Sequence, residues 1–349
     1  MKKNLLVNVI TNNKGILCTL VIGIVMPLVT HEPYVISILI LYLLYAYLGQ
    51  CWDLLGGYTG QISLGNAAFF GLGAYSSAIL FNFYGISPWV GMWLGVLLAV
   101  GASIIIGYPC FRFGMRGIFF AFFTLAFNEA LRTVISAGAN APALAFMGGP
   151  EGITIKLIPS GDWLTQIYNL QFFGRGRSIP YYYIFFGLLI MGLLILRLTE
   201  GSRFGYCLKA IKADESVAES VGINILKYKL YALALSSALT ALAGTFYAFY
   251  IGHIEPGSFM GLNTTLHIIL VPLIGGSGYI YGSLVGALVV IGISYLIKFC
   301  INPQYGPALT SFAFGLIMIV IVLCLREGIA LKIIKLRHKF MRKRSLTKP

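Results

Sequence analysis

Two residues of this 349-residue chain are placed to act inside a membrane, Glu129 and Arg132. They stand three positions apart in an apolar run, so on a helix they share one face and can form an ion pair. A lone charge near mid-membrane costs at least about 2.5 kcal/mol on insertion scales, so an unpaired one requires a water-filled route. The two side chains therefore either line a route for a zwitterionic solute, with Asn128 beside them, or form a structural ion pair.

A second polar group lies in and beside a glycine-rich stretch, Gly56 to Tyr75, which is too polar and flexible at its start for an uninterrupted helix. The group comprises Asp53, Gln61, Ser63 and Asn66. Broken helices at membrane depth are tolerated mainly where they are buried or line a cavity, and both alternatives stay open here. The candidate residues of a solute pathway are Gln61, Ser63, Asn66, Asn128, Glu129 and Arg132.

Motifs for catalysis or cofactor binding are absent from the sequence. There is no G-x-x-x-x-G-K-[ST] loop for nucleotide phosphates and no H-E-x-x-H metal motif, and the four histidines are dispersed. The six cysteines form no C-x-x-C pair, which argues against a zinc site or a disulfide framework. We therefore expect no catalytic residues, no bound metal and no cofactor, and transport is the remaining function for a chain of many spans.

The composition predicts an all-α polytopic membrane protein. Charged residues make up 10% of the chain and hydrophobic residues 58%, whereas a soluble domain carries about 25% charged residues. The formal charge of +14 could suggest a nucleic-acid partner. The basic residues lie in loops and one tail rather than among exposed aromatic residues, so no nucleic-acid partner is expected.

The apolar runs predict about ten membrane-spanning helices in a transmembrane domain of residues 1–325, followed by a basic tail of residues 326–349. The eighth is short for the ~20 residues that a spanning helix needs. The third begins after a loop or broken entry at residues 57–63. The predicted spans are residues 15–29, 33–49, 64–81, 88–108, 118–135, 181–198, 226–251, 264–275, 283–299 and 307–325.

Basic residues orient these spans. With the N-terminus inside, only Lys156, Arg175 and Arg177 fall in segments predicted to be external. Lysine and arginine are enriched in cytoplasmic loops, so both termini are predicted to be cytoplasmic and the loop of residues 138–180 external. The tail alternates basic and apolar residues, which suits either a helix lying on anionic membrane lipid or a topology signal alone.

One long polar interruption, Ser202 to Tyr231, has the features of a folded segment. It reads as two short helices, the second capped by Asp214 or by Ser216, which has capping-box spacing to Glu219. Gly222 is placed to end that helix in a left-handed conformation. An amphipathic helix between two spans can occupy a groove on another protein, and the alternative is a solvated loop.

Five segments, in this order along the chain, resemble the membrane permeases of branched-chain amino acid ABC importers, the LivM/LivH family, and more closely the LivM type. Singly the glycine motifs are weak, but jointly they are specific. The segments are GYTGQISLGNAAFFGLGAY (57–75), FAFFTLAFNEALR (120–132), GGPEGI (148–153), SRFGYCLKAIKADESVAESVGINILKYKLYA (202–232) and LIGGSGYIYGSLVGA (273–287).

This resemblance implies the fold of an ABC importer permease in a bacterial plasma membrane and a cytoplasmic coupling segment at residues 202–223. The implied partners are a second homologous permease, two ATPases that bind and hydrolyse ATP, and an extracytoplasmic solute-binding protein that contacts residues 148–152. Asn66 departs from relatives that often carry His or Gln there. The implied ATPase-coupling residues are Arg203, Ala210, Asp214, Glu215, Ala218, Glu219 and Gly222.

Two alternatives to a branched-chain amino acid permease stay open. The same motifs occur in related ABC permeases for urea and short-chain amides. A stand-alone ion-coupled transporter would use Glu129 as a proton site but would leave the built segment at residues 202–223 without a role. A membrane-bound enzyme has no residue set to support it.

Overall fold

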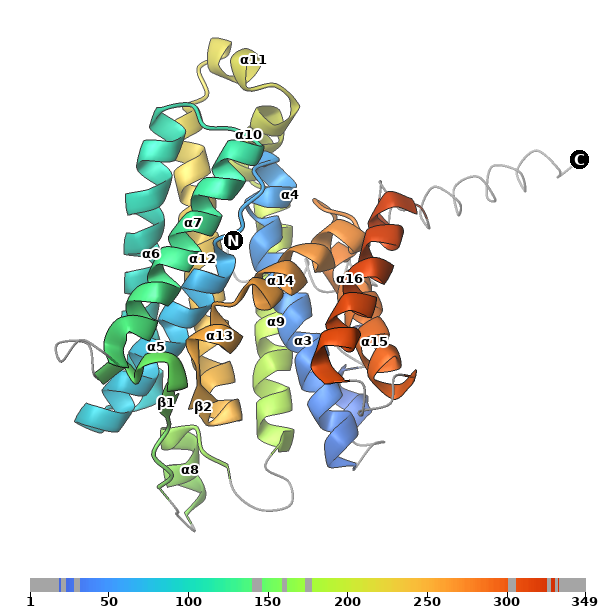
Figure 1. The fold of residues 1–349 in the computed structure, drawn as a ribbon. Helices are drawn as coiled ribbons and strands as arrows, with labels where there is room; N and C mark the ends of the chain where they lie inside the picture. Colours follow the sequence, from blue (N-terminus) through green and yellow to red (C-terminus); the bar gives the residue numbers. More distant parts are fainter. Residues whose placement is uncertain are drawn as a thin grey trace, which may run out of the picture.

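The computed structural model describes residues 32–139, 146–158, 162–172, 178–300 and 306–324, with short pieces at 19, 23–27, 328–329 and 332. The predicted first span and the basic tail lie largely outside these residues. The described chain is almost entirely helical (Figure 1). Its main helices are α3 (Pro33–Asp53), α4 (Gly56–Thr59), α5 (Asn66–Tyr84), α6 (Pro88–Arg112), α7 (Ile118–Ser136), α8 (Trp163–Asn169), α9 (Ser178–Glu200), α10 (Arg203–Ala213), α11 (Glu215–Ser220), α12 (Ile225–Ile251), α13 (Pro256–Phe259), α14 (Leu262–Gly275), α15 (Gly282–Cys300) and α16 (Gly306–Cys324).

Each predicted span from the second onward corresponds to a helix. Within the described residues, seven helical segments are long and apolar enough to cross a membrane, and α15 and α16 are apolar as well. The structure therefore agrees with about ten spans. The predicted eighth span, 264–275, was too short, because α13 and α14 together form one spanning segment, Pro256–Gly275.

Helices α5, α6 and α12 pack tightly side by side, because glycines remove side chains where two backbones meet. A Cβ at Gly73 of α5 would collide with the backbone of Ala241 on α12. A Cβ at Gly244 of α12 would collide in turn with the backbone of Phe70. Small residues at helix contacts are the usual means of close packing in membranes, and the glycine-rich stretch supplies one of them here at Gly73.

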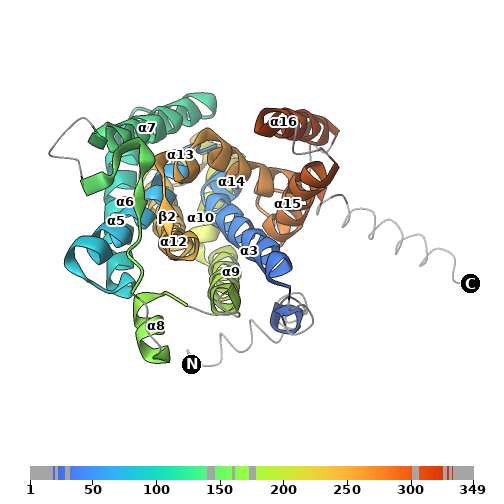
Figure 2. The same cartoon turned by 60° about the horizontal axis from the view of Figure 1, so that its bottom comes forward.

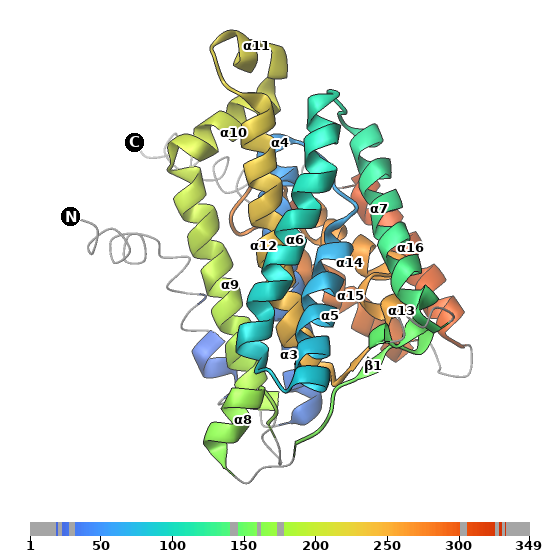
Figure 3. The same ribbon diagram turned by 90° about the vertical axis from the view of Figure 1, so that its left-hand side faces the viewer.

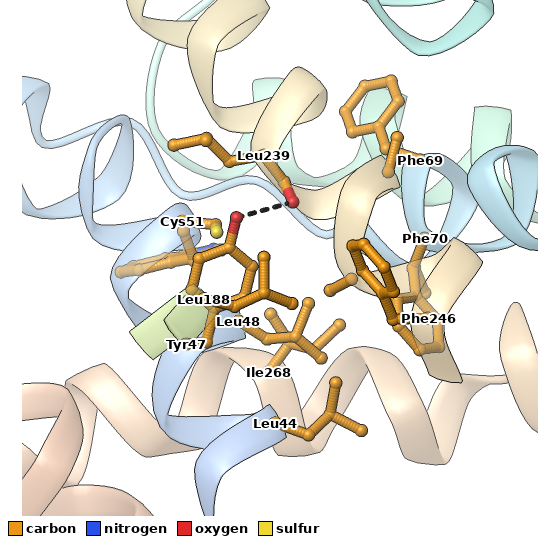
Figure 4. Close-up of a cluster of buried hydrophobic side chains, with 14 of the residues drawn as sticks. Leu44, Tyr47, Leu48, Cys51, Phe69, Phe70, Leu188, Leu239, Phe246 and Ile268 are labelled. Carbon is orange, nitrogen blue, oxygen red and sulfur yellow. Dashed lines mark hydrogen bonds between the residues drawn. The ribbon is translucent and has the colours of Figure 1, made fainter. Parts of the chain in front are cut away.

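Helix α3 lies at the centre of the fold, and buried hydrogen bonds to α12 hold its interior face among large apolar side chains (Figure 4). The Tyr47 hydroxyl donates a 3.0 Å hydrogen bond to the carbonyl of Leu239 on α12. Ile268 of α14 and Leu188 of α9 pack in the same cluster. Because apolar packing alone is weakly directional in lipid, this bond helps to fix α3 against α12.

Two glycine-rich breaks interrupt the spans, as the sequence predicts, and they touch. The first follows α4, where Gly60 has φ 75° and residues 60–65 run without helix into α5. The second joins α14 to α15, where Gly276 and Gly278 have φ 117° and 82°. A Cβ at Gly57 would lie 2.7 Å from the backbone nitrogen of Gly278, so neither break tolerates a side chain at this contact.

The two ends of the bundle differ in character. Helices α10 and α11 project at one end, and the short strand pair and α8 lie at the other (Figures 1 and 3). There β1 (Ile153–Thr154) pairs antiparallel with β2 (His253–Ile254). The segment predicted as a plain loop, 138–180, thus contains a strand and a helix of its own.

Candidate functional site

The projecting segment between α9 and α12 is built from two capped helices, as predicted. The Ser202 hydroxyl accepts a 3.2 Å hydrogen bond from the amide of Gly205 and caps α10. Gly222 ends α11 with φ 84°, and its amide bonds the carbonyl of Glu219 at 2.9 Å. The segment is therefore a defined structure at one end of the bundle rather than a solvated loop.

Asp214 is the cap of α11, and the alternative cap at Ser216 is wrong. The Asp214 carboxylate accepts hydrogen bonds from the hydroxyl and amide of Ser216 and from the amide of Val217, at 2.6, 2.8 and 3.2 Å. These bonds favour the ionised form, so they lower the pKa of Asp214 below its usual value. Because Ser216 donates to Asp214, its hydroxyl does not form the predicted capping box.

Glu215 is the best-connected residue of the segment. Its Oε1 lies 2.6 Å from Nζ of Lys229 on α12, and its Oε2 lies 2.9 Å from Nε of Arg116 in the turn between α6 and α7. The amide of Gln61, in the first glycine-rich break, donates to Oε1 at 3.3 Å. One carboxylate thus joins α11 to three other parts of the chain, and it points into the protein rather than toward a partner.

A second link from the projecting segment runs through Lys212 to the first glycine-rich break, and Asp53 joins that region to the second break. The Lys212 ammonium donates to the carbonyl of Gly57 at 2.7 Å. The buried Asp53 carboxylate accepts from the amide of Gly278 at 2.9 and 3.1 Å. Helix α10 is therefore bonded to the first break, and the end of α3 beside that break is bonded to the second.

The predicted coupling residues divide between an inner and an outer side. Ala218 is buried and Glu215 faces inward, whereas Arg203, Asp214, Glu219 and Gly222 are exposed and Ala210 is half-buried. The outer side also carries three exposed apolar side chains that sequence analysis missed. These are Tyr206, Val217 and Val221. The i, i+4 spacing of Val217 and Val221, which places both on one side of the helix, was the available signal.

Two polar clefts flank α11. One of about 600 Å³ lies between the α6–α7 turn and the start of α12, and Arg112, Glu219 and Asn224 are among its lining residues. The other, of about 330 Å³, lies between α10 and the first glycine-rich break and is lined by Gln61 and Lys212 among others. The segment thus offers exposed apolar side chains next to charged recesses, the arrangement of a protein-docking surface.

Of the predicted pathway residues, four are buried and hydrogen-bonded. Gln61 bonds Glu215, and the carbonyl of Ser63 accepts from the indole of Trp52 at 2.8 Å. The Asn66 amide donates to the hydroxyl of Ser236 at 3.4 Å, and the Asn128 amide donates to the carbonyl of Met260 at 2.8 Å. In this conformation they connect helices, and Gln61 also lines the cleft beside α10.

Glu129 and Arg132 form the predicted ion pair. Glu129 Oε2 accepts from Nη2 and Nε of Arg132 at 2.6 and 2.8 Å. The side chains are 37% and 39% exposed, on an edge of α7. They are therefore paired yet still reachable from outside the chain.

Helices α7 and α16 flank α13 and α14 on one side of the bundle (Figure 2). Helix α14 carries a stripe of exposed apolar side chains, Leu262, Leu266 and Leu273, along its length. An exposed apolar stripe on a membrane helix faces either lipid or another membrane subunit.

Comparison with known proteins identifies the chain's relatives. The family model described as the branched-chain amino acid transport system permease component matches residues 34–322. The high-affinity branched-chain amino acid transport permease LivM of Escherichia coli (strain K12) is 26% identical over 286 residues, covering 78% of this chain and 65% of the relative. A probable LivM of Methanocaldococcus jannaschii is 24% identical over 279 residues, covering 73% and 75%.

A permease named for sugar import is also similar to this chain. The fructose import permease FrcC of Rhizobium meliloti is 26% identical over 269 residues, covering 65% of this chain and 69% of the relative. No solved structure matches the chain. The chain spans less than two thirds of the length of the Escherichia coli relative, 65%.

Proposed function

This chain belongs to the branched-chain amino acid transport permease family, and we propose that it is a permease subunit of an ATP-driven importer of branched-chain, hydrophobic amino acids. In this proposal it forms part of the translocation pathway and couples that pathway to partner ATPases. The chain itself hydrolyses nothing, and ATP binds to the partners. The membrane is a bacterial plasma membrane, with both termini and the α10–α11 end cytoplasmic.

The observation that carries this proposal is the anchoring of the projecting segment. A segment that only decorated the surface would need no buried bonds, whereas α10 and α11 are bonded through Lys212 and Glu215 to both sides of a glycine-rich break. Force applied to α10 and α11 reaches the break through charge-assisted hydrogen bonds, which hold their geometry better than apolar contacts do. We infer that this is the coupling element.

The partner ATPase is proposed to receive the outer side of this element. Val217 and Val221 lie one turn apart and exposed, so they suit insertion into an apolar groove. Exposed Arg203 and Glu219 lie on the same segment and suit polar contacts at the rim of such a groove. Two copies of the ATPase are expected, one for each permease.

The second, homologous permease is proposed to cover the side formed by α7, α13, α14 and α16. The translocation pathway then runs between the two subunits along the stripe of Leu262, Leu266 and Leu273. Glu129 and Arg132 lie on α7 at the edge of this side and can offer complementary charges to a zwitterion. The buried residues Gln61, Ser63, Asn66 and Asn128 are proposed to position the helices around this route.

The proposed solute is a branched-chain amino acid because the stripe on α14 is aliphatic. The relatives include permeases named for amino acid transport and for sugar transport. A route for a sugar would be expected to present hydroxyl and amide groups in place of aliphatic side chains. Urea and short-chain amides fit an aliphatic stripe poorly for the same reason. A stand-alone ion-coupled transporter is not favoured, because it would leave the anchored segment of α10 and α11 without a role.

A solute-binding protein is proposed to dock at the opposite end, on exposed Pro150 and Glu151. The neighbouring glycines are structural. A Cβ at Gly152 would collide with the backbone of Ile254, so the glycines of this turn hold it against β2. The basic tail, residues 326–349, is proposed to lie on anionic lipid of the inner leaflet.

Mass spectrometry of proteins that co-purify with the tagged chain in mild detergent tests the proposal. We expect an ATPase and a second permease. Reconstitution of that complex with the binding protein should then give ATP-dependent leucine uptake that fructose and urea do not compete. Recovery of the chain alone, active for uptake with a driving ion and without ATP, would overturn the proposal and point to Glu129.

A further inference from the structure

Helix α8, at the end of the bundle opposite α10 and α11, exposes its apolar side chains and covers its polar ones. Its large apolar side chains Trp163, Leu164, Ile167 and Tyr168 point outward, and Leu164 is 80% exposed. Its polar residues Thr165, Gln166 and Asn169 are the half-buried or buried ones. A helix that faces water shows the reverse pattern, so this outer side faces something apolar.

The position of α8 is fixed at the level where a membrane span begins. The Ser87 hydroxyl donates to the carbonyl of Tyr168 at 2.6 Å, and the Trp89 indole donates to the carbonyl of Ile167 at 2.9 Å. Both donors lie at the start of α6, whose first residue is Pro88. These two bonds give the carbonyls of Ile167 and Tyr168, near the end of α8, side-chain partners from the start of α6.

The outer side of α8 continues the apolar stripe of α6. On α6 the exposed apolar side chains include Trp89, Trp93 and Leu97, along a helix long enough to cross a membrane. Trp89 also lines a shallow recess of about 510 Å³ together with Leu164 and Tyr168. The apolar surface that the span presents to lipid therefore continues onto α8 across this recess, whose lining is apolar apart from Thr165.

We propose that α8 lies in the headgroup region of the bilayer leaflet opposite the coupling segment, with its apolar side inserted toward the acyl chains. Tryptophan and tyrosine concentrate at this depth, because their rings are apolar at one end and polar at the other. A short amphipathic helix lying flat at an interface buries only such an outer side. The proposal goes beyond the proposed transport function and requires only that α6 spans the membrane.

A lipid surface explains the pattern better than a soluble partner. The residues of α8 from Trp163 to Asn169 carry no charge, and the one charge next to them is exposed Asp162 at the N-cap of the helix. A docking surface for a soluble protein is usually rimmed by polar side chains. A solute-binding protein would therefore reach the turn at Pro150 and Glu151 but not α8, because lipid covers the outer side of α8.

Site-directed spin labelling of the assembled complex in phosphatidylcholine vesicles tests this proposal. A nitroxide is attached at Leu164→Cys or Tyr168→Cys, in a chain whose six native cysteines are replaced and whose uptake is retained. Collision rates are measured with oxygen, which partitions into lipid, and with a water-soluble nickel complex. The matched controls are Leu97→Cys, in the exposed stripe of α6, and Glu151→Cys on the exposed turn.

We expect the oxygen-to-nickel collision ratio at both α8 positions to be severalfold above that of Glu151→Cys and close to that of Leu97→Cys. A ratio equal to that of Glu151→Cys would overturn the proposal. Protection from the nickel complex that arises only when the binding protein is added would also overturn it, in favour of protein docking. In the native chain, brominated lipid should quench the fluorescence of Trp163. The Trp163→Phe variant should therefore lose part of the emission that brominated lipid quenches. If the quenched emission is the same in the variant and the native chain, Trp163 is not inserted.

Discussion

The Lys229 ammonium and the Glu215 carboxylate are 2.6 Å apart, and only 3% of the lysine side chain is exposed. This pair joins the second turn of α12 to the first residue of α11, so it fixes the angle between the projecting helix and a membrane span. A buried charge without its partner is strongly unfavourable, which makes the pair sensitive to the loss of either member.

Glu215→Gln is expected to uncouple the importer. The amide keeps the shape of the side chain but weakens the bonds to Lys229 and Arg116, and hydrogen bonds to charged groups contribute about 1.5–3 kcal/mol each. We expect ATP-dependent uptake to fall about tenfold, equivalent to about 1.4 kcal/mol of lost coupling. The measurement is the ratio of solute transported to ATP hydrolysed in proteoliposomes.

Glu219→Gln is the matched control for that variant. It removes the same charge from the same helix at an exposed position for which no ion pair is found among the described residues. Its transport ratio should stay near that of the native protein, because a polar contact at the rim of an interface contributes little to the binding energy, whereas Glu215 holds α11 to the rest of the chain. Lys229→Met combined with Glu215→Gln should recover folded protein relative to Glu215→Gln alone, and no recovery would show that the two residues act independently.

Val221→Glu is expected to weaken assembly with the ATPase. Val221 is 71% exposed, so the substitution costs the isolated permease little, but it places a charge in the proposed apolar groove. The amount of ATPase recovered with the tagged chain should fall severalfold while membrane levels stay constant. Ser220→Glu introduces the same charge one residue earlier, and an equal loss there would argue against a specific valine contact.

Gly222→Ala is expected to strain the end of α11. Gly222 has φ 84° with open space around it, so the cost is that of the left-handed backbone, about 1–2 kcal/mol for a residue with a Cβ. Coupled uptake should fall moderately, and Gly222→Pro should be worse because it also removes the amide that bonds Glu219. Gly201→Ala, at a glycine without positive φ, should be close to native in the same assay.

The sequence predicted most of the spans, the caps at Asp214 and Gly222, and the Glu129–Arg132 pair, because each depends on neighbours within a few positions. It could not predict the connections of Glu215, because Arg116, Gln61 and Lys229 come from segments far apart in the chain. Resemblance to relatives assigned Glu215 to the partner surface, yet its carboxylate faces inward. Spacing alone does not say which side of a six-residue helix is covered.

The glycine-rich breaks show the same limit. Their composition predicted interruptions at both places, but not that Gly57 and Gly278 would meet or that Asp53 would bond across the contact. Helix α8 was missed altogether, because seven residues with outward apolar side chains resemble neither a span nor a soluble amphipathic helix. Tertiary position decides such segments, and the linear pattern does not.

Asp53→Ala is expected to loosen the contact between the breaks. The substitution leaves the Gly278 amide without its acceptor inside the protein, at a cost of about 1–3 kcal/mol. The thermal midpoint of the detergent-purified chain should drop by several degrees. Asp53→Asn keeps an acceptor oxygen and should lose less, and equal losses in the two variants would mean that the charge, rather than the bond, holds the contact.

Glu129→Gln separates the two roles left open for the ion pair on α7. Both side chains are more than a third exposed, and pairs of this kind contribute only about 0–1 kcal/mol to stability, so the folded amount in membranes should hardly change. If Glu129 lines the pathway, uptake of leucine should fall about tenfold, because a solute ammonium loses its complement at a cost of about 1.4 kcal/mol. Arg132→Gln should produce a comparable fall through the solute carboxylate. Expression and uptake that decline together in both variants would instead assign the pair to helix packing and move the pathway to the aliphatic stripe of α14.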